Sequence, residues 1–249
     1  MKAFVFAAGL GTRLKPITDT MPKALVPIQG KPLLDHVMEK LQSSGMTDFV
    51  INIHHFGEQI IDYLQQNWKD VPVAISDERA ALLETGGAVK KAIPLLGDDS
   101  FLIHNVDILS NANLAQLVAE HTNKKAAATL LVSNRKSSRY LLFDKDMRLK
   151  AWTNTQTGEV KSPYSDIDIN TLTPYAFGGI HCFSPLLFAE MNPYPDKFSI
   201  IDFYLDQCLK YPIYGWKQEN LQLLDVGKIN SLELANNYIA HLEETKEVK

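Results

Sequence analysis

The chain has 249 residues, of which 45% are hydrophobic and 22% are charged, as in an ordinary soluble globular protein. A formal net charge of −4 argues against a broad basic surface, so we expect no nucleic-acid partner. No apolar run approaches the roughly 20 residues of a membrane span. The N-terminus lacks the zones of a signal peptide, which predicts a cytoplasmic protein without a membrane partner. Cys182 and Cys208 lack metal-ligand spacing and are expected to be small core residues.

The strongest local pattern lies in the first 32 residues. The apolar run 3–8 predicts a buried strand, which breaks into the segment 9–13 (GLGTR). Two glycines there let the backbone turn tightly and bring its N–H groups near a ligand. Thr12 adds a hydroxyl, and Arg13 adds a cation whose fork suits phosphate oxygens. A second cation, Lys23, follows between two prolines, and the whole pattern predicts a site for several phosphates.

Two familiar phosphate motifs do not fit this segment. The dinucleotide fingerprint needs a third glycine three residues after the second, where this chain has Leu14. The P-loop needs Gly-Lys followed by Ser or Thr, but Gly30-Lys31 is followed here by Pro32. By itself, the glycine turn is also compatible with an ordinary strand-to-helix loop.

Helices and strands alternate through the rest of the N-terminal half. Helical spacing of apolar residues predicts helices over 33–41, 60–64, 86–93 and 114–121, the first capped by Gly45. Short apolar runs predict strands over 49–53, 71–75, 101–104 and 126–132. This alternation predicts an α/β fold with a parallel sheet covered by helices on both faces. Ligands of such sheets bind at the carboxyl ends of the strands, where both the 9–13 turn and Asp107 fall.

The pattern changes after Val132. Apolar segments over 140–143 and 149–152 predict a hairpin, and the polar residues 154–173 predict a loop or lid. A strand is expected over 175–183, with a bulge or a close ligand approach at Gly178-Gly179. A helix over 199–209 is expected to begin with a capping box of Ser199 and Asp202. Strands over 213–217 and 221–226, a helix over 231–242 and a frayed tail over 243–249 complete the chain.

Two carboxylates follow predicted strands and are candidate metal ligands. Asp107 ends the stretch FLIHNVD, and Asp225 precedes a glycine turn. Mg²⁺ prefers oxygen ligands and usually takes one or two carboxylates plus substrate phosphates, so the pair predicts a magnesium site. Each is also compatible with the role of a cap or turn aspartate. Farther up the chain, residues 84–88 (ETGGA) precede a helix, where bare backbone would admit a flat ring, although a plain loop is an equal alternative.

Together these segments resemble the sugar-phosphate nucleotidyltransferases, also called nucleoside-diphosphate-sugar pyrophosphorylases. The resemblance rests on residues 7–27, on 84–88 with Asp107, and on 225–227 (DVG). It is strongest to short members such as the N-acetylmuramate 1-phosphate uridylyltransferases and mannose-1-phosphate guanylyltransferase-like proteins. It implies a three-layer α/β sandwich with a mostly parallel, Rossmann-like central sheet and an antiparallel substrate-side addition. We therefore expect a single domain over 1–249, with a nucleotide-binding part over 1–132 and a sugar-binding and metal-completing part over 133–249.

The reaction implied by the resemblance joins a sugar 1-phosphate to a nucleoside triphosphate and gives a nucleotide-sugar and pyrophosphate. The expected partners are an NTP, with UTP or GTP favoured, and a sugar 1-phosphate, and the implied cofactor is Mg²⁺. The resemblance assigns nucleotide binding to Ala8, Gly9, Gly11, Thr12, Arg13, Gly86 and Gly87, catalysis to Arg13 and Lys23, sugar contact to Gly179, and the metal to Asp107 and Asp225.

Two departures from the family pattern keep alternatives open. Val106 stands where the family usually has glycine, and the Glu-Lys-Pro sugar motif of long members has no match. Val106 is compatible with a non-catalytic nucleotide-sugar sensor or partner subunit. The strand-Gly-x-Gly pattern also suggests a nicotinamide-dependent dehydrogenase, against which the missing third glycine counts. The sequence does not decide the base, the sugar, the pathway or the oligomeric state.

Overall fold

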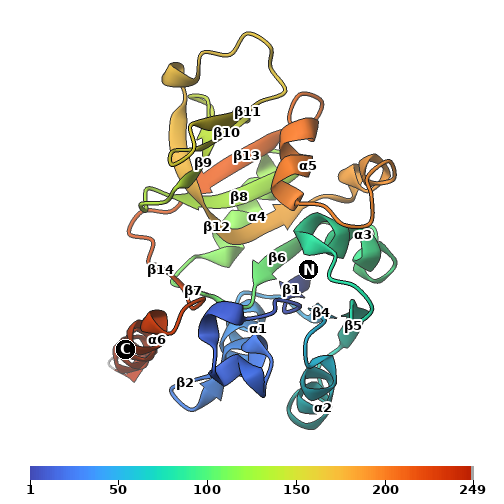
Figure 1. Ribbon diagram of the computed structural model, residues 1–249, viewed down its shortest axis with the longest axis vertical. Helices are drawn as coiled ribbons and strands as arrows, with labels where there is room; N and C mark the ends of the chain where they lie inside the picture. Colours follow the sequence, from blue (N-terminus) through green and yellow to red (C-terminus); the bar gives the residue numbers. More distant parts are fainter. Residues whose placement is uncertain (248–249) are drawn as a thin grey trace.

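The computed structural model describes residues 1–247, which fold around a mixed β-sheet (Figure 1). The strands follow the order β11-β10-β9-β12-β6-β1-β4-β5, and β8 and β13 extend the sheet beside β12. Strands β6, β1, β4 and β5 pair in parallel, because a helix returns the chain to the same edge between successive strands. They span Lys2–Phe6 (β1), Asp48–Ile53 (β4), Val73–Asp77 (β5) and Phe101–Asn105 (β6).

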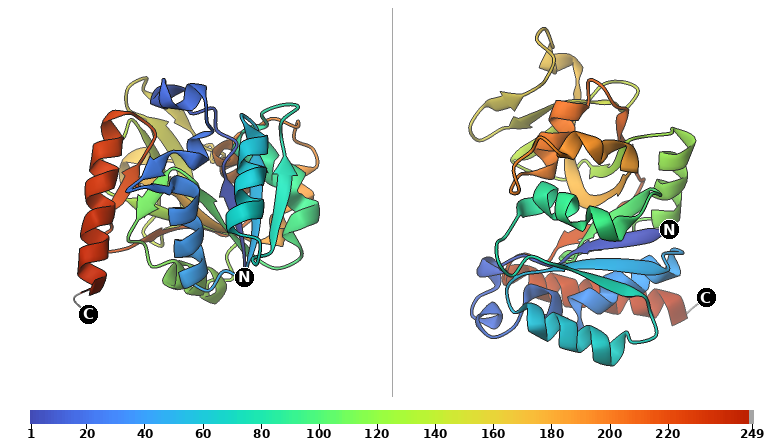
Figure 2. Two further views of the ribbon diagram at one scale, coloured as in Figure 1. Left: turned by 90° about the horizontal axis from the view of Figure 1, so that it is seen from below. Right: turned by 90° about the vertical axis from the view of Figure 1, so that its right-hand side faces the viewer.

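Helices cover both faces of this sheet and give three layers (Figures 1 and 2). One face is covered by α1 (Leu33–Ser43), α2 (Gly57–Asn67) and α4 (Leu114–Asn123), and the other by α3 (Glu84–Leu96) and α5 (Ile200–Gln207). The last helix, α6 (Asn230–Glu247), packs against the hairpin of β2 (Pro27–Ile28) and β3 (Lys31–Pro32). The predicted α/β fold, with a parallel core and helices on both faces, is confirmed.

The remaining part of the sheet is mainly antiparallel, as the change of pattern after Val132 predicts. The long strand β12 (Thr173–Phe183) pairs antiparallel with β6, β8 and β9. Strands β9 and β10 form the predicted hairpin, β11 extends it, and β13 runs parallel to β8. The bounds are Ala128–Ser133 (β8), Arg139–Phe143 (β9), Leu149–Asn154 (β10), Glu159–Lys161 (β11) and Ile213–Lys217 (β13).

A bulge interrupts β12 at the predicted glycine pair. The register between β12 and β8 shifts between Phe177 and His181. Within this shift Gly179 adopts a φ of +72°, a left-handed conformation that glycine reaches without a steric penalty. The expectation of a bulge at Gly178-Gly179 is therefore confirmed.

A short ladder outside the main sheet ties the C-terminal part of the chain to the end of β6. Strand β7 (Ile108–Ser110) follows β6 almost directly and pairs with β14 (Leu223–Asp225). Short 3₁₀ helices complete the connections: η1 (Thr12–Leu14), η2 (Ile17–Asp19), η3 (Lys23–Leu25), η4 (Ile169–Thr171), η5 (Pro185–Leu187) and η6 (Ala189–Met191).

The predicted caps are present, with one difference. Gly45, at φ +90°, follows the end of α1 and donates its N–H to a carbonyl of the last turn. Ser199 Oγ accepts the N–H of Ile201 at 3.2 Å and begins α5. Asp202 does not take the capping-box role, because its carboxylate accepts a 2.9 Å bond from Lys161 instead.

Two boundary predictions were wrong. The segment predicted as a loop over 154–173 contains β11 and η4. Strand β11 is exposed at the sheet edge, so it carries no apolar pattern that could reveal it. The tail predicted as frayed is helical through Glu247, because its Glu and Lys residues are good helix formers. Residues 248–249 of that tail lie outside the described residues, and the division at residue 132 stays a prediction.

The core contains titratable groups that burial keeps uncharged. Cys182 and Cys208 are buried, as predicted, and burial raises the pKa of both thiols, that of Cys208 to about 11. Burial also lowers the pKa of His104 and His121 to about 4 and that of His181 to about 3. Among the described residues, no helix is long and apolar enough to cross a membrane.

Candidate active site

A pocket of about 260 Å³ opens at the carboxyl ends of the parallel strands. Each of these strands contributes a residue at or just beyond its end: Phe6 in β1, Asn52 in β4, Glu78 after β5 and Asn105 in β6. This is where an open parallel sheet binds its ligands. Of the predicted site residues, the pocket is lined by Ala8, Gly9, Lys23 and Asp107, together with Ala7, Leu82, Glu84, Thr85 and Val106.

Lys23 and Asp107 form an ion pair inside this pocket. Lys23 Nζ donates to Asp107 Oδ2, and the exposed fractions of the two side chains are 9% and 21%. A lysine this deeply buried needs an anionic partner, because an unpaired charge in a poorly solvated site is strongly unfavourable. Lys23 begins the short helix η3, which follows a proline and positions the side chain. The pair therefore places a cation ready for an incoming phosphate beside a carboxylate.

Asp225 is brought next to Asp107 by the β7–β14 ladder. Asp225 lies opposite Ile108, and the N–H of Val226 donates to the carbonyl of Asp107 at 2.8 Å. Asp225, at the end of β14, thus lies beside the turn that carries Asp107, although the two residues are 118 positions apart in the sequence. Within residues 1–247, no three His, Cys, Asp or Glu side chains come together as a ready-made metal site.

Arg13 reaches the same corner of the site. A Cβ atom built on Gly227 would lie 2.5 Å from Asp225 Oδ1 and 2.7 Å from Arg13 Nη2. Both groups therefore lie against this glycine, and any side chain there would displace them. The structure brings Arg13, Lys23, Asp107 and Asp225 into one region from four separate segments.

The two glycines of the 9–13 turn have different surroundings. Gly11 adopts φ +64°, its carbonyl accepts from Thr18 Oγ1 at 2.8 Å, and a Cβ there would lie 2.8 Å from the Thr18 methyl group. Gly11 therefore shapes the turn. Around Gly9, by contrast, no atom lies within 4 Å of the position of a Cβ. Gly9 is thus the point where a ligand can approach the backbone closely. Thr12 begins η1 on the same turn.

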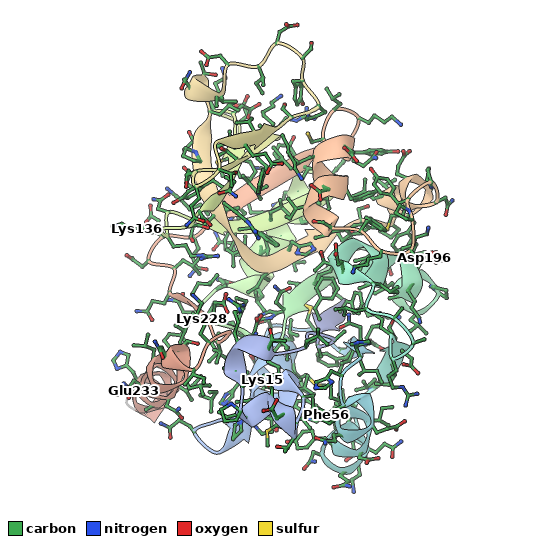
Figure 3. The ribbon with its side chains drawn as sticks, in the orientation of Figure 1. Lys15, Phe56, Lys136, Asp196, Lys228 and Glu233 are labelled. Atoms are coloured by element: carbon green, nitrogen blue, oxygen red, sulfur yellow. The ribbon has the colours of Figure 1, made fainter. Side chains whose placement is uncertain are left out.

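Gly86 and Gly87 lie in the first turn of α3 and serve packing. Their N–H groups both donate to the carbonyl of Phe198, at 2.9 Å and 3.3 Å. A Cβ on Gly86 would lie 2.4 Å from the Phe198 ring, and one on Gly87 would lie 1.9 Å from the carbonyl oxygen of Asp196, which lies beside α3 (Figure 3). Their backbone is therefore covered by a neighbouring segment, and the pocket is lined by Glu84 and Thr85 instead. A direct base contact by these glycines stays a prediction that this packing does not favour.

The bulge in β12 lies against the turn that carries Asp107. A Cβ on Gly179 would lie 3.0 Å from both Asn105 Nδ2 and Ile108 Cγ1, the residues on either side of that turn. The antiparallel part of the sheet therefore meets the pocket at Gly179. A sugar contact by Gly179 stays a prediction.

Sequence reasoning missed two buried polar residues at the base of the pocket, Asn52 and Glu78. Asn52 Oδ1 accepts the N–H groups of Ala7 and Ala8, at 2.7 Å and 3.2 Å. Asn52 Nδ2 donates to Glu78 Oε1 at 2.7 Å, and Glu78 Oε2 accepts the N–H of Leu83 at 3.3 Å. Burial raises the pKa of the Glu78 carboxyl, and the bonds from Asn52 and Leu83 oppose that rise. One signal was present in the sequence: Asn52 is a polar residue inside an otherwise apolar strand.

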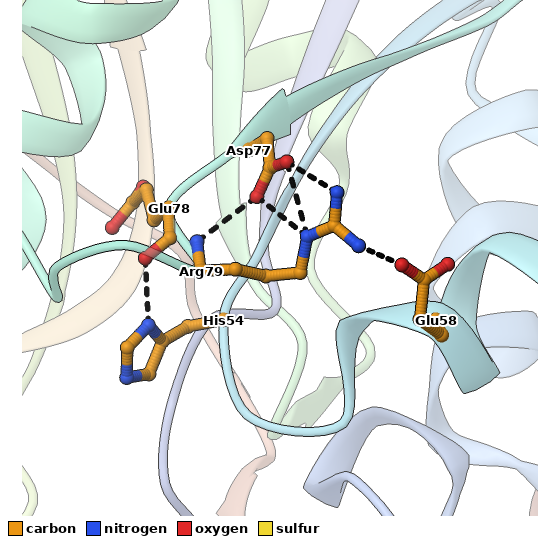
Figure 4. A network of polar contacts seen from close by, with 5 residues as sticks. All are labelled: His54, Glu58, Asp77, Glu78 and Arg79. Atoms are coloured by element: carbon orange, nitrogen blue, oxygen red, sulfur yellow. Dashed lines mark hydrogen bonds and ion pairs between the residues drawn. The ribbon is translucent and has the colours of Figure 1, made fainter.

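A wider polar network holds the Glu78 segment in place (Figure 4). His54 Nδ1 donates to the backbone carbonyl of Glu78 at 2.7 Å. Arg79 binds the Asp77 carboxylate through Nε and Nη2 and reaches Glu58 at the start of α2 through Nη1. The start of the loop between β5 and α3 is thus fixed to the residue after β4 and to the first turn of α2.

Comparisons with known proteins show which family the chain resembles. A family model described as "Nucleotidyl transferase" matches residues 2–161. An N-acetylmuramate alpha-1-phosphate uridylyltransferase of Neisseria meningitidis is 44% identical over 112 residues, which are 45% of this chain and 48% of that protein. A D-glycero-alpha-D-manno-heptose 1-phosphate guanylyltransferase of Aneurinibacillus thermoaerophilus is 27% identical over 97% of this chain and 99% of that protein.

Among solved structures, HddC from Yersinia pseudotuberculosis, complexed with GMP-PN, superimposes with a TM-score of 0.75. It is 22% identical, and the match covers 96% of this chain and 99% of that chain, so it supports the fold. The match to the uridylyltransferase relatives spans only about half of their length.

Proposed function

Because the chain belongs to the nucleotidyl transferase family, we propose that it transfers a nucleotidyl group from UTP or GTP to a sugar 1-phosphate, giving a nucleotide-sugar and pyrophosphate. The observation that carries the proposal is the buried Lys23–Asp107 pair in a pocket at the carboxyl ends of the parallel strands. The uridylyltransferase and guanylyltransferase relatives support UTP and GTP as the two candidate nucleotide donors. The absence of a membrane-crossing helix among the described residues is compatible with a cytoplasmic location.

The chemistry of this reaction matches the residue types in the pocket. An oxygen of the sugar 1-phosphate attacks the α-phosphorus, the bond from that phosphorus to the bridging oxygen breaks, and pyrophosphate leaves. The attacking oxygen is already ionised, so no strong general base is required. Catalysis must bring two anions together and stabilise the charge that develops on the transferred phosphoryl group. Lys23 and Arg13 supply the cations, and the open backbone at Gly9 admits the triphosphate.

The residues present fit a magnesium ion shared with the substrate. Asp107, in the turn before β7, and Asp225, at the end of β14, offer oxygen ligands from adjacent segments, and Mg²⁺ usually takes one or two carboxylates plus substrate phosphates. When bound, the ion would neutralise phosphate charge. Lys23, which pairs with Asp107 in the same pocket, would supply a second positive charge for the phosphates.

The test is pyrophosphate release over a grid of nucleoside triphosphates and sugar 1-phosphates, with and without Mg²⁺. Lys23→Met keeps an unbranched side chain that is one atom shorter and removes the charge, and should lower kcat by about 10²–10³-fold, as for loss of a group that stabilises developing charge. Lys31→Met is the matched control, because Lys31 pairs with Glu39 outside the pocket and should leave kcat unchanged. Full activity of Lys23→Met would refute the proposed role. Nucleotide binding without turnover in every cell of the grid would favour the sensor instead.

A further inference from the structure

Asn52 and Glu78 connect three segments of the chain that meet at the pocket. Asn52 lies in β4, and its Oδ1 holds the turn after β1 through two N–H groups, those of Ala7 and Ala8. Glu78 follows β5, and its Oε2 holds the loop before α3 through the N–H of Leu83. The bond from Asn52 Nδ2 to Glu78 Oε1 joins the two halves. Both side chains also line the pocket.

The burial of this pair makes its hydrogen-bond pattern strict. The exposed fractions of Asn52 and Glu78 are 4% and 1%, so water cannot replace a missing partner at low cost. Asn52 presents one acceptor and one donor group, and the Glu78 carboxylate accepts on both oxygens. Each oxygen and the amide nitrogen thus has an assigned partner. A change of one group therefore leaves a neighbouring backbone N–H unpaired or places two like groups face to face.

The bonded backbone groups belong to the segments that a nucleotide would contact. Ala7 and Ala8 lead into the open backbone at Gly9, and Leu83 precedes Glu84 and Thr85 at the pocket wall. We propose that Asn52 and Glu78 are a positioning pair, which sets the distance between the phosphate-binding turn and the loop before α3 and thereby determines nucleotide affinity. The inference rests on the proposed function only in taking nucleotide affinity as its readout.

Exchange of the two functional groups gives a sharp test. In Asn52→Asp, the new carboxylate still accepts from Ala7 and Ala8 but faces the Glu78 carboxylate. In Glu78→Gln, the new amide satisfies either Asn52 or Leu83 and turns its NH₂ group toward the other donor. In the double variant, the carboxylate at position 52 accepts from the NH₂ group at position 78, whose carbonyl accepts from Leu83. The double variant thus restores every bond with the direction of one reversed, at the net charge of the original chain.

The measurements are the dissociation constants of UTP and GTP and the KM for each substrate, at a temperature well below the unfolding transition of every variant. Each single variant should weaken nucleotide binding by about tenfold, the effect of one unpaired buried group. The double variant should bind within about threefold of the original chain. The KM for the sugar 1-phosphate should change less than that for the nucleotide, which a general loss of structure would not produce.

Asp35→Asn is the control for a partly buried polar network outside the pocket. Asp35 accepts from Tyr63 Oη at 2.5 Å and from Trp68 Nε1 at 2.7 Å, away from the pocket lining. This variant should lower Tm and leave nucleotide affinity unchanged.

Several outcomes would overturn the inference. If charge alone matters, Glu78→Gln removes a negative charge near the triphosphate and binds nucleotide more tightly. If the role is only structural, the single variants lower Tm and keep the original affinity, as the Asp35 control does. Failure of the double variant to recover would show that the bond pattern does not matter. If the original chain binds no nucleotide, the proposed function fails, independently of the behaviour of the pair.

Discussion

Replacing Gly87 by alanine should destabilise the fold without weakening nucleotide binding, whereas replacing Gly9 should do the reverse. A Cβ on Gly87 would lie 1.9 Å from the carbonyl oxygen of Asp196 and 3.0 Å from the Leu83 Cβ. The carbonyl belongs to the same segment that accepts both N–H groups at the start of α3, so it cannot withdraw without breaking those bonds. At Gly9, no atom lies within 4 Å of the added carbon, but the residue lines the pocket.

The size of the effect follows from two opposing contributions. Overpacking a rigid site costs about 1–3 kcal/mol, or more where backbone must move, while alanine in a helix gains about 1 kcal/mol over glycine. With a backbone atom at 1.9 Å, we take the upper end and expect a net loss of about 2 kcal/mol. For a chain of this size, that lowers Tm by about 4–8 °C. Gly9→Ala should change the free energy of unfolding by less than about 0.5 kcal/mol, as for a substitution without a clash.

The assay pairs urea unfolding of each variant with nucleotide titration of the folded protein. Gly87→Ala should lower the midpoint of the unfolding transition and leave the dissociation constant of the nucleotide unchanged. Gly9→Ala should leave the midpoint unchanged and raise the dissociation constant, because its methyl group occupies the space through which the ligand approaches the backbone. The reasoning is refuted if Gly87→Ala unfolds like the original chain and binds nucleotide more weakly. That result would give Gly87 the direct base contact that the family resemblance implies.

Three further outcomes are expected. Ser199→Ala removes the acceptor that caps α5 and should lower the free energy of unfolding by about 1 kcal/mol, as urea unfolding would measure. Ser199→Asp keeps an acceptor at this position and should retain most of the original stability. Burial lowers the pKa of His181 in the folded chain to about 3, whereas the ordinary pKa of a histidine is about 6.5. Below pH 6.5 the unfolded chain therefore binds more protons at this residue than the folded chain does. Stability from this group is therefore complete above pH 6.5 and falls as the pH drops toward 3, and His181→Phe should reduce the acid-induced loss of Tm. Burial raises the pKa of the Cys182 and Cys208 thiols, so neither should react with a thiol reagent at pH 8 until denaturant is added, as mass spectrometry would show.

The predictions that succeeded rest on periodicity and local chemistry. Strand β4 and helix α1 each carry a pattern that a few neighbouring residues determine, and Gly45 ends α1 because a left-handed residue is required there. The bulge at Gly179 also follows from local chemistry, because paired glycines weaken a regular strand. Exposed edge strand β11 buries no side chain in a repeating pattern, so it left no such signal.

The glycines of α3 show why a local sequence motif does not predict contacts with segments that are distant in the sequence. Residues 84–88 identify a helix start with bare backbone, and locally that backbone is free to accept a base or another segment. The choice is made by Asp196 and Phe198, about 110 positions later, whose carbonyls and ring fill the space. No pattern around Gly86 contains that information, because it depends on how α5 packs on α3.

Asn52 and Glu78 represent the opposite case, in which the sequence held a signal that motif reading did not use. A buried strand excludes polar side chains unless their hydrogen-bonding groups find partners. Asn52, near the end of the apolar run Phe49–Ile53, therefore implies a buried polar partner, and the same reasoning applies to a carboxylate such as Glu78 just after the next strand. Because the carboxyl ends of parallel strands meet at one edge of the sheet, Asn52 and Glu78 could have been predicted to be partners. The conflict between an apolar strand and its polar residue thus points to the site more directly than the glycine motif does, and the exchanged double variant tests that interpretation at the level of single hydrogen bonds.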